Sequence, residues 1–181
     1  TLMVNESLLS LKLEGKSRPH FFCGVLTVVS KLFNMINPEK AFFGEKDAQQ
    51  LILIKKMVSD MKYPIDVIGC PTIREDGGLA MSSRNKYLTV EERIDAGVVY
   101  RALSNAEKMF NAGERNAQII KNAVVNTLNS ENKITIDYVS VADLKSLDEI
   151  AGEIVSKILI SLAVYIRNVR LIDNIMFDEL I

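Results

Sequence analysis

The sequence predicts an α/β protein in two parts, a portion of a doubly wound parallel sheet followed by a small α+β unit. In the first part, segments of helical and strand character alternate with short connections, which is typical of parallel strands joined by right-handed helical crossovers. From about residue 89 onward, two helical segments precede three runs rich in alternating or β-branched residues, which favours an antiparallel sheet. We therefore expect two domains, residues 1–84 and 85–181.

The composition excludes several classes of protein. Of the 181 residues, 48% are hydrophobic and 25% are charged, an ordinary globular mixture that disordered and collagen-like chains do not have. The formal net charge of −1 provides no global field for nucleic acid or an anionic membrane. The longest apolar run, residues 158–166, is about half as long as a membrane span, and the chain start lacks signal-peptide features. We expect a cytoplasmic protein with no nucleic-acid or membrane partner.

Residue types that commonly bind metals or act as nucleophiles are few in this sequence or poorly spaced for those roles. Cys23 and Cys70 lie far apart without CxxC spacing, and the single histidine, His20, cannot complete a zinc set with them. No Ser/His/Asp or Cys/His arrangement can be assigned around His20. We therefore expect no metal site formed by side chains of the chain and no covalent catalysis.

The first part has four expected elements. In chain order they are a helix over residues 24–36, a strand over 41–43, a helix over 46–61 and a strand over 65–70. Asn37-Pro38 and Tyr63-Pro64 end the two helices, because proline cannot continue a helix. Ligands of such sheets bind outside the carboxyl ends of the strands, so the loops after Gly44 and Cys70 should open on one crevice.

The second part has five expected elements. They are a helix from Thr89 to about residue 112, a helix over residues 116–128, and strands over 134–141, 154–166 and 169–175. Thr89 and Glu92 have the spacing of a capping box, which marks the start of the first helix. We place the domain boundary between Arg84 and Thr89, where Asn85-Lys86 has turn chemistry.

The segment Gly44-Glu45-Lys46-Asp47 is a candidate anion site. It follows a strand and opens a helix, so its backbone N–H groups and the helix dipole favour an anion, with Lys46 as a point charge. A charged first turn without a ligand is the alternative. Gln49-Gln50 follows, and a glutamine there can donate to and accept from a carboxylate or hydroxyl, although such residues are more often solvated.

The loop of residues 77–85 is the second candidate. Two glycines precede Ser82, Ser83 and Arg84, and phosphate oxygens are bound by backbone amides, hydroxyls and the bidentate fork of a guanidinium. The alternative is a flexible linker with an isolated arginine. Near the last strand, Asp173-Asn174 is expected to cap or turn rather than to bind a ligand.

Together, four blocks make the chain resemble the pantothenate synthetase (pantoate-beta-alanine ligase) family. They are Leu13–Pro19, Phe43–Gln50, Gly78–Asn85 and Arg170–Asn174, which occur in the family's order over essentially the whole chain. The resemblance implies an α/β fold, namely the later half of a Rossmann-like nucleotide-binding domain followed by an α+β carboxyl-terminal lid domain with antiparallel strands. It also implies activation of pantoate by ATP and Mg²⁺, capture of the pantoyl adenylate by beta-alanine, and a homodimer.

The resemblance also implies roles for individual residues. ATP would be bound by Gly44, Glu45, Lys46, Asp47, Ile73, Met81, Ser82, Ser83 and Arg84. The catalytic residues among them would be Lys46, Ser82, Ser83 and Arg84. Pantoate would be bound by Gln50, Val25, Val28 and Val29.

Two departures from the family pattern affect the expected activity. Where the family has Gly-His-Phe, this chain has His20-Phe21-Phe22, so the family's histidine falls on Phe21. The family's His-x-Gly-His motif has no counterpart, so we expect the later portion of such an enzyme, without ligase activity of its own. Two other hypotheses remain: another nucleotidyltransferase of the same superfamily, and a non-catalytic nucleotide-binding or self-associating module. Substrate-dependent release of pyrophosphate distinguishes the enzymes.

Overall fold

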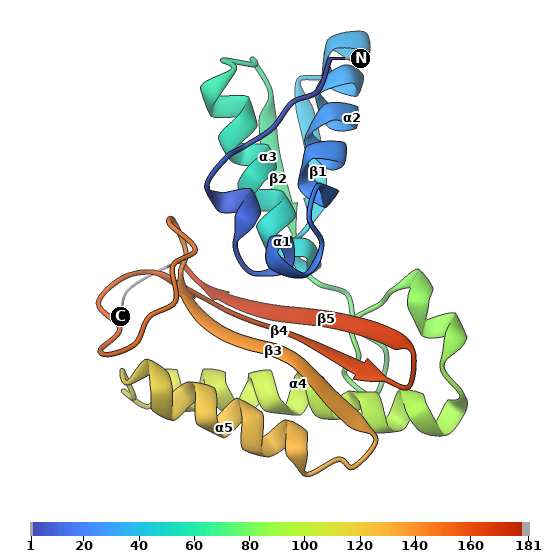
Figure 1. Cartoon of the computed structure of the whole chain (residues 1–181), viewed down its shortest axis with the longest axis vertical. Helices are drawn as coiled ribbons and strands as arrows, with labels where there is room; N and C mark the ends of the chain where they lie inside the picture. The colour runs from blue at the N-terminus through green and yellow to red at the C-terminus, as the bar shows by residue number, and fades with distance from the viewer. Residues whose placement is uncertain (1, 179–181) are drawn as a thin grey trace. The chain divides into compact units, whose positions relative to one another are not determined.

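The computed structural model describes residues 2–178 and divides into two compact units, Thr1–Pro71 and Thr72–Ile181 (Figure 1). This division falls earlier in the chain than the expected boundary between residues 84 and 85. The reason is packing, since Leu79 and Leu88 belong to the core of the second unit and Arg74 pairs with Asp173 there. Each unit is described by itself below.

The first unit contains a two-stranded parallel sheet and its helices. Its elements are a short 3-10 helix (Leu9–Leu11), α1 (Glu14–Ser17), α2 (Phe21–Ile36), β1 (Lys40–Gly44), the 3-10 turn η2 (Glu45–Asp47), α3 (Ala48–Asp60) and β2 (Asp66–Cys70). β1 and β2 pair in parallel from Lys40 opposite Asp66 to Gly44 opposite Cys70. The expected order of helix, strand, helix and strand is therefore confirmed, as is the parallel pairing.

The core of the first unit lies between the two long helices and one face of the sheet. Its buried members are Phe22, Leu26, Phe33, Leu53, Ile54, Met57 and Ile65. Ala41 and Phe43 of β1 pack against this core, whereas Phe42, on the opposite face, is 64% exposed. Successive strand residues point to opposite faces, so within residues 2–71 the helices cover only one face of the sheet.

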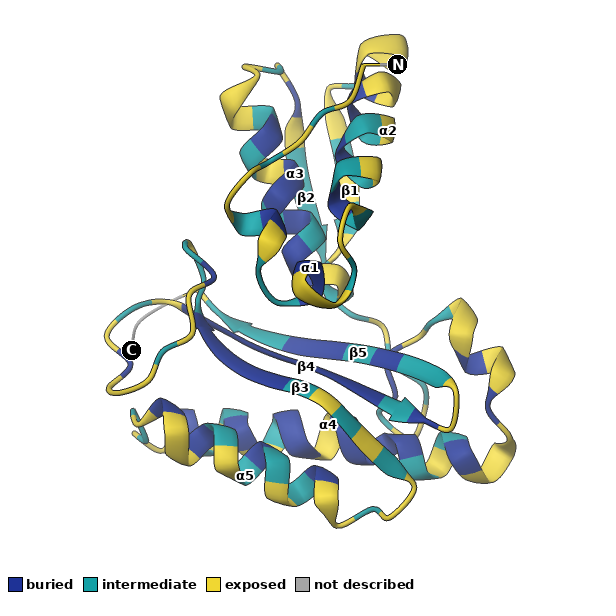
Figure 2. Ribbon diagram, in the orientation of Figure 1, coloured by how far each residue is buried: buried dark blue, intermediate teal, exposed yellow. Residues whose placement is uncertain are grey.

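The second unit is an antiparallel sheet with two helices packed on one face (Figure 1). Its elements are the 3-10 helix η3 (Ser83–Tyr87), α4 (Val90–Asn111), α5 (Ala117–Asn129), β3 (Ile134–Asp143), β4 (Ile158–Ile166) and β5 (Val169–Phe177). The strand order is β3-β4-β5, with both pairings antiparallel, as expected. Figure 2 shows β4 buried along most of its length, and its alternate residues Ile158, Ile160, Leu162 and Val164 enter the core against α4 and α5.

Local signals explain the starts of both helices in this unit. Thr89 Oγ1 accepts a hydrogen bond from Glu92 N, and Thr89 N donates to the Glu92 carboxylate, which confirms the capping box. Asn116 Oδ1 accepts hydrogen bonds from the first backbone N–H groups of α5. The strand expected from residue 154 begins instead at Ile158, because Ile154 N donates to the carbonyl of Arg115, 2.7 Å away, and not to a neighbouring strand.

In residues 2–178, no helix is both long enough and apolar enough to cross a bilayer.

Candidate functional site

Most of the expected site residues lie in two segments, one in each unit, and the three expected valines lie apart from them on α2. The first is Gly44–Gln50, at the carboxyl edge of the parallel strands. Gly44 has extended backbone angles and is paired with Cys70, the last residue of β2. The two strands therefore end side by side, and the segments that follow Gly44 and Cys70 start from the same edge of the sheet. This edge is where open α/β sheets bind their ligands.

Lys46 lies in a 3-10 turn that precedes α3. Asp47 has non-helical backbone angles, its side chain makes no capping hydrogen bond, and α3 begins at the next residue, Ala48. The helix dipole thus begins after Gly44–Asp47, which corrects the expectation that these residues open the helix. The Lys46 side chain is 18% exposed, and its Nζ lies 3.9 Å from Asp47 Oδ2. The turn places an ammonium group beside a carboxylate at the sheet edge.

Glu45 is accommodated by a glycine on the neighbouring strand. A Cβ atom built on Gly69 would lie 2.7 Å from Glu45 Oε1 and 3.1 Å from Leu51 Cδ2. Gly69 therefore allows the Glu45 side chain to lie directly on β2, next to the turn that carries Lys46.

The two adjacent glutamines have different environments. Gln49 is buried; its Oε1 accepts a hydrogen bond from Glu14 N at 3.0 Å, and its Nε2 donates to the carbonyls of Leu9 and Lys12, both at 2.8 Å. The interpretation of Gln49 as a solvated residue is therefore wrong. Helical periodicity could have indicated that Gln49 is buried, because it lies four residues before the core residue Leu53 and so shares a helix face with it. Gln50, the expected pantoate ligand, is half-buried.

The three valines expected near pantoate lie on α2 in unlike positions. Val25 and Val29 are half-buried and pack against the core of the first unit, whereas Val28 is 52% exposed. Val28 is thus the one of the three valines whose side chain is mainly open to solvent.

The residues at the start of α2 include the single histidine. His20 is exposed and has a positive φ of 67°. Phe21 lies under the guanidinium of Arg18, which is 3.6 Å from the ring centroid.

In the second unit, residues 73–81 form a tight hairpin, not a flexible linker. Arg74 and Ala80 form an antiparallel bridge, and Met81 N donates to the carbonyl of Ile73 at 2.9 Å. Gly78 has a φ of +85°, and a Cβ atom there would lie 2.3 Å from the ring of Tyr100. The hairpin needs a glycine at this position for both reasons.

The groups suited to phosphate binding follow this hairpin. Ser82 Oγ accepts a hydrogen bond from Arg84 N at 3.2 Å, which starts η3. Ser83 and Arg84 are exposed and Ser82 is half-exposed. Ile73 and Met81, also expected at the nucleotide, are 71% and 57% exposed. Two hydroxyls and a guanidinium are thus presented close together along the chain.

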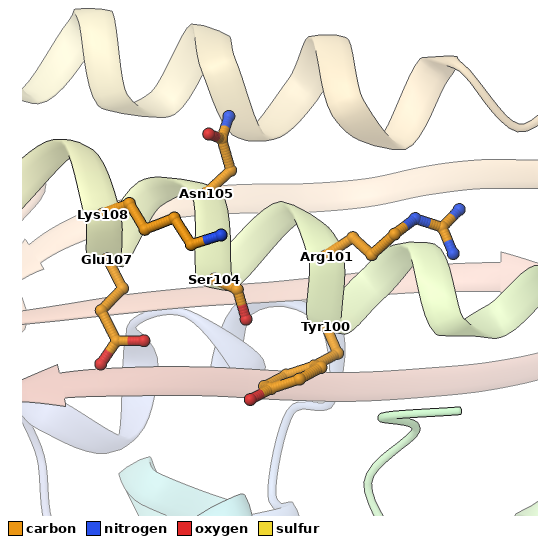
Figure 3. A pocket seen from close by; sticks show the side chains of 6 residues that line it. All are labelled: Tyr100, Arg101, Ser104, Asn105, Glu107 and Lys108. Atoms are coloured by element: carbon orange, nitrogen blue, oxygen red, sulfur yellow. The ribbon is translucent and has the colours of Figure 1, made fainter. Parts of the chain in front are cut away.

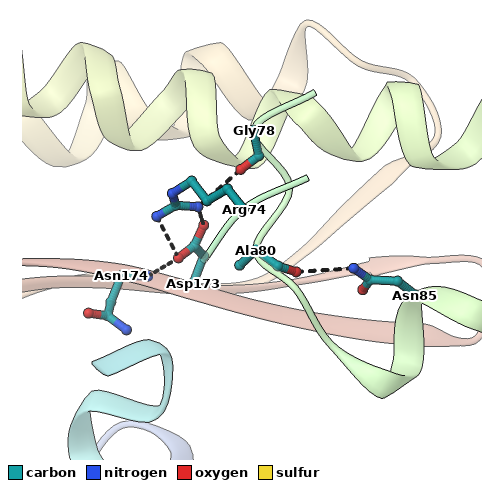
Figure 4. A network of polar contacts seen from close by, with 6 residues as sticks. All are labelled: Arg74, Gly78, Ala80, Asn85, Asp173 and Asn174. Atoms are coloured by element: carbon teal, nitrogen blue, oxygen red, sulfur yellow. Dashed lines mark hydrogen bonds and ion pairs between the residues drawn. The ribbon is translucent and has the colours of Figure 1, made fainter. Parts of the chain in front are cut away.

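An ion pair between the half-buried Arg74 and the buried Asp173 holds the hairpin on the sheet (Figure 4). Arg74 Nη1 lies 2.6 Å from Asp173 Oδ2, Nη2 donates to Oδ1 at 3.2 Å, and Nη1 also donates to the carbonyl of Gly78. The guanidinium also stacks on Tyr100, 4.2 Å from the ring centroid. Asp173 lies within β5, so its expected role as a cap or turn residue is wrong. Its partner is 99 residues away in the sequence, which no local pattern reveals.

A separate cavity of about 570 Å³ runs along α4 (Figure 3). It is lined by Tyr100, Arg101, Ser104, Asn105, Glu107 and Lys108, none of which is an expected site residue. Tyr100, Ser104 and Glu107 project from the same side of the helix. Within residues 2–178, no group of three or more His, Cys, Asp or Glu side chains could hold a metal ion.

Comparison with known proteins gives consistent matches. The sequence model of the pantoate-beta-alanine ligase family matches residues 2–176. A pantothenate synthetase from Clostridium botulinum (strain Loch Maree / Type A3) is 49% identical over 174 residues, which are 96% of this chain and 62% of that protein. One from Carboxydothermus hydrogenoformans is 50% identical over 167 residues, 91% of this chain and 58% of that protein. The chain thus spans about three fifths of their length.

Solved structures agree with the sequence matches. The crystal structure of pantothenate synthetase from Thermus thermophilus superposes with a TM-score of 0.92 at 36% identity, covering 99% of this chain and 64% of that one. The pantoate-beta-alanine ligase from Francisella tularensis, complexed with beta-gamma ATP and beta-alanine, gives a TM-score of 0.69 at 34% identity, covering 97% of this chain and 58% of that one.

Proposed function

Because the chain belongs to the pantoate-beta-alanine ligase family, we propose that it is the nucleotide-holding and pantoate-holding portion of an enzyme that joins pantoate to beta-alanine at the expense of ATP. The observation that carries this proposal is the position of Lys46, on the turn at the carboxyl edge of β1 and β2. This edge is the ligand-binding edge of open α/β sheets.

The reaction has two steps. A carboxylate oxygen of pantoate attacks the α-phosphorus of ATP, and the bond to pyrophosphate breaks. The amine of beta-alanine then attacks the acyl carbon of the pantoyl adenylate, loses a proton, and AMP leaves. Both steps depend on positioning anionic reactants and stabilising the charge that develops on them, for which no protein nucleophile is needed.

We assign the charge-stabilising roles to two segments. Lys46 would stabilise charge at the α-phosphate, with Asp47 near the ribose hydroxyls and with Gly44 and Glu45 completing the turn. The loop Met81–Arg84 would bind the triphosphate through its hydroxyls and guanidinium, and the exposed Ile73 would contact the adenine through its backbone. The exposure of Ser83 and Arg84 supports this assignment.

Pantoate is assigned to Gln50 and to Val25, Val28 and Val29. An amide can donate to and accept from the hydroxyl and carboxylate groups of pantoate.

Mg²⁺ would arrive with the nucleotide, because it is commonly held by substrate phosphates and water with only one or two carboxylates. When bound, it lowers the negative charge of the triphosphate. We extend the proposal to a cytoplasmic homodimer whose second unit, which includes residues 85–181, acts as a lid.

Titration calorimetry of the 181-residue chain with ATP tests the proposal. We expect binding by the unchanged chain and about tenfold weaker binding by Lys46→Ala, since a charge-assisted contact is lost. Lys55→Ala, on the exposed side of α3, is the matched control and should bind like the unchanged chain. Failure of the unchanged chain to bind millimolar ATP would contradict the proposed nucleotide role.

A further inference from the structure

Asn85 differs in its burial from the four residues that precede it in the chain. The four preceding residues, Met81–Arg84, are exposed or half-exposed, whereas Asn85 is 2% exposed. A buried amide directly after an exposed loop needs a physical reason, because burying a polar side chain is unfavourable unless it is hydrogen-bonded.

The side chain of Asn85 closes the loop on itself. Its Nδ2 donates to the carbonyl of Ala80 at 3.1 Å (Figure 4). Its backbone N donates to the carbonyl of Ser82 at 3.0 Å. Ala80 and Asn85 flank the loop Met81–Arg84. One amide therefore ties the residue before the loop to the residue after it.

The same amide group connects the loop to the framework of the second unit. Asn85 Nδ2 also donates to Glu75 Oε1 at 2.7 Å, and Glu75 Oε2 lies 3.7 Å from Arg93 Nη1 on α4. The adjacent residue, Arg74, is paired with Asp173 on β5. The loop is thus fixed by way of the hairpin to both the helix and the sheet.

The other end of the amide has no such partner. Asn85 Oδ1 is buried and makes no hydrogen bond with any residue between 2 and 178. Its orientation follows from the two acceptors at Nδ2, Glu75 Oε1 and Ala80 O, which only the NH₂ group can satisfy. A buried acceptor without a donor is destabilising, so stability alone does not account for this residue.

We propose that Asn85 is a positioning residue that holds Ser82, Ser83 and Arg84 in the conformation that binds the triphosphate of ATP. This inference rests on the proposed function. An ordered loop binds more tightly because the entropy of ordering has been lost before the ligand arrives. Asn85 acts on the nucleotide only through the loop, since its own polar atoms are turned toward Glu75 and Ala80 or buried.

The experiment compares variants of the full 181-residue chain. Asn85→Ala removes the amide, and Asn85→Asp keeps its size but replaces the donor with an acceptor that faces Glu75 and the Ala80 carbonyl. Asn116→Ala is the matched control, because it also removes an asparagine that makes two hydrogen bonds, in this case at the start of α5. Each variant is measured by thermal unfolding, by amide hydrogen exchange of residues 81–84, and by calorimetry with ATP and with adenosine.

For both Asn85 variants we expect faster exchange in residues 81–84 and about tenfold weaker binding of ATP, with adenosine binding unchanged, since ordering of the phosphate contacts is lost. Asn116→Ala should lower the unfolding temperature without changing exchange in the loop or ATP affinity. The inference is overturned if Asn85→Ala affects ATP affinity no more than Asn116→Ala does, or if exchange in the loop is unchanged. Absence of ATP binding by the unchanged chain would instead overturn the proposed function, and hydrogen exchange would still show whether Asn85 orders the loop.

Discussion

Gln49 and Gln50 show how neighbouring residues of one type can have different tasks. Gln49 uses both ends of its amide on backbone groups of residues 9–14 and is 4% exposed, so it fixes the start of the chain to α3. Gln50 is half-buried on the next face of the helix. We therefore separate Gln49, a structural glutamine, from Gln50, which is proposed to bind pantoate.

This separation predicts losses of stability of different size for two alanine substitutions. Gln49→Ala leaves the Glu14 N–H and two carbonyls without their partner and should lower the free energy of unfolding by about 1–3 kcal/mol, because unpaired buried polar groups are costly. Gln50→Ala should lower it by less than about 0.5 kcal/mol, as expected for a substitution that breaks no buried network. Urea unfolding measures both values. Equal losses for the two variants would contradict the assignment.

Elements with strong local signals were predictable from the sequence. The capping box at Thr89 and the cap at Asn116 locate the starts of α4 and α5, because their hydrogen bonds are made within one helical turn. The start of β4 and the hairpin of residues 73–81 were not predictable from local sequence. Both depend on partners far away in the sequence, because Ile154 bonds to Arg115 and Arg74 pairs with Asp173. The segment with Lys46 was located correctly, but its 3-10 turn was not.

The start of α4 also predicts a dependence of stability on pH. A hydrogen bond from the backbone N–H of Thr89 lowers the pKa of Glu92 from its ordinary value of 4.5. The positive charge of the Arg167 guanidinium, 2.6 Å away, lowers it further. A carboxyl with a lower pKa in the folded state binds protons more weakly there than in the unfolded state. Its stabilising contribution is therefore complete above pH 4.5 and is lost as the pH falls through the folded pKa.

We expect Glu92→Gln to be less stable than the unchanged chain at pH 7, with the difference shrinking as the pH falls below about 4, where Glu92 itself becomes neutral. Glu91→Gln, in the same turn but exposed, is the control and should show a smaller difference at pH 7. Urea unfolding at several pH values measures this. A difference that stays constant from pH 7 to pH 3 would show that the charge of Glu92 does not contribute.

The parallel sheet of the first unit bears on the molecule as a whole, because helices cover only one of its two faces. Parallel sheets are normally buried on both faces, yet Phe42 is 64% exposed on the face opposite the helices. The chain spans 62% of the length of the relative from Clostridium botulinum and has no His-x-Gly-His motif. The residues described therefore supply Lys46 and the Ser82–Arg84 loop, but not the histidines that belong to the family pattern.

We predict that the purified 181-residue chain forms no pantothenate from ATP, pantoate and beta-alanine. Lys46 and Arg84 can stabilise negative charge, but rate enhancement requires preorganised donors around the phosphorus under attack, and removing even one such donor commonly costs about a hundredfold in rate. Mass spectrometric detection of pantothenate, with pyrophosphate release followed in parallel, measures both steps; the longer Clostridium botulinum relative serves as the positive control. Formation of pantothenate at the rate of that control would mean that residues 1–181 contain a complete active site. ATP binding without turnover is the result that agrees with the proposed division of roles.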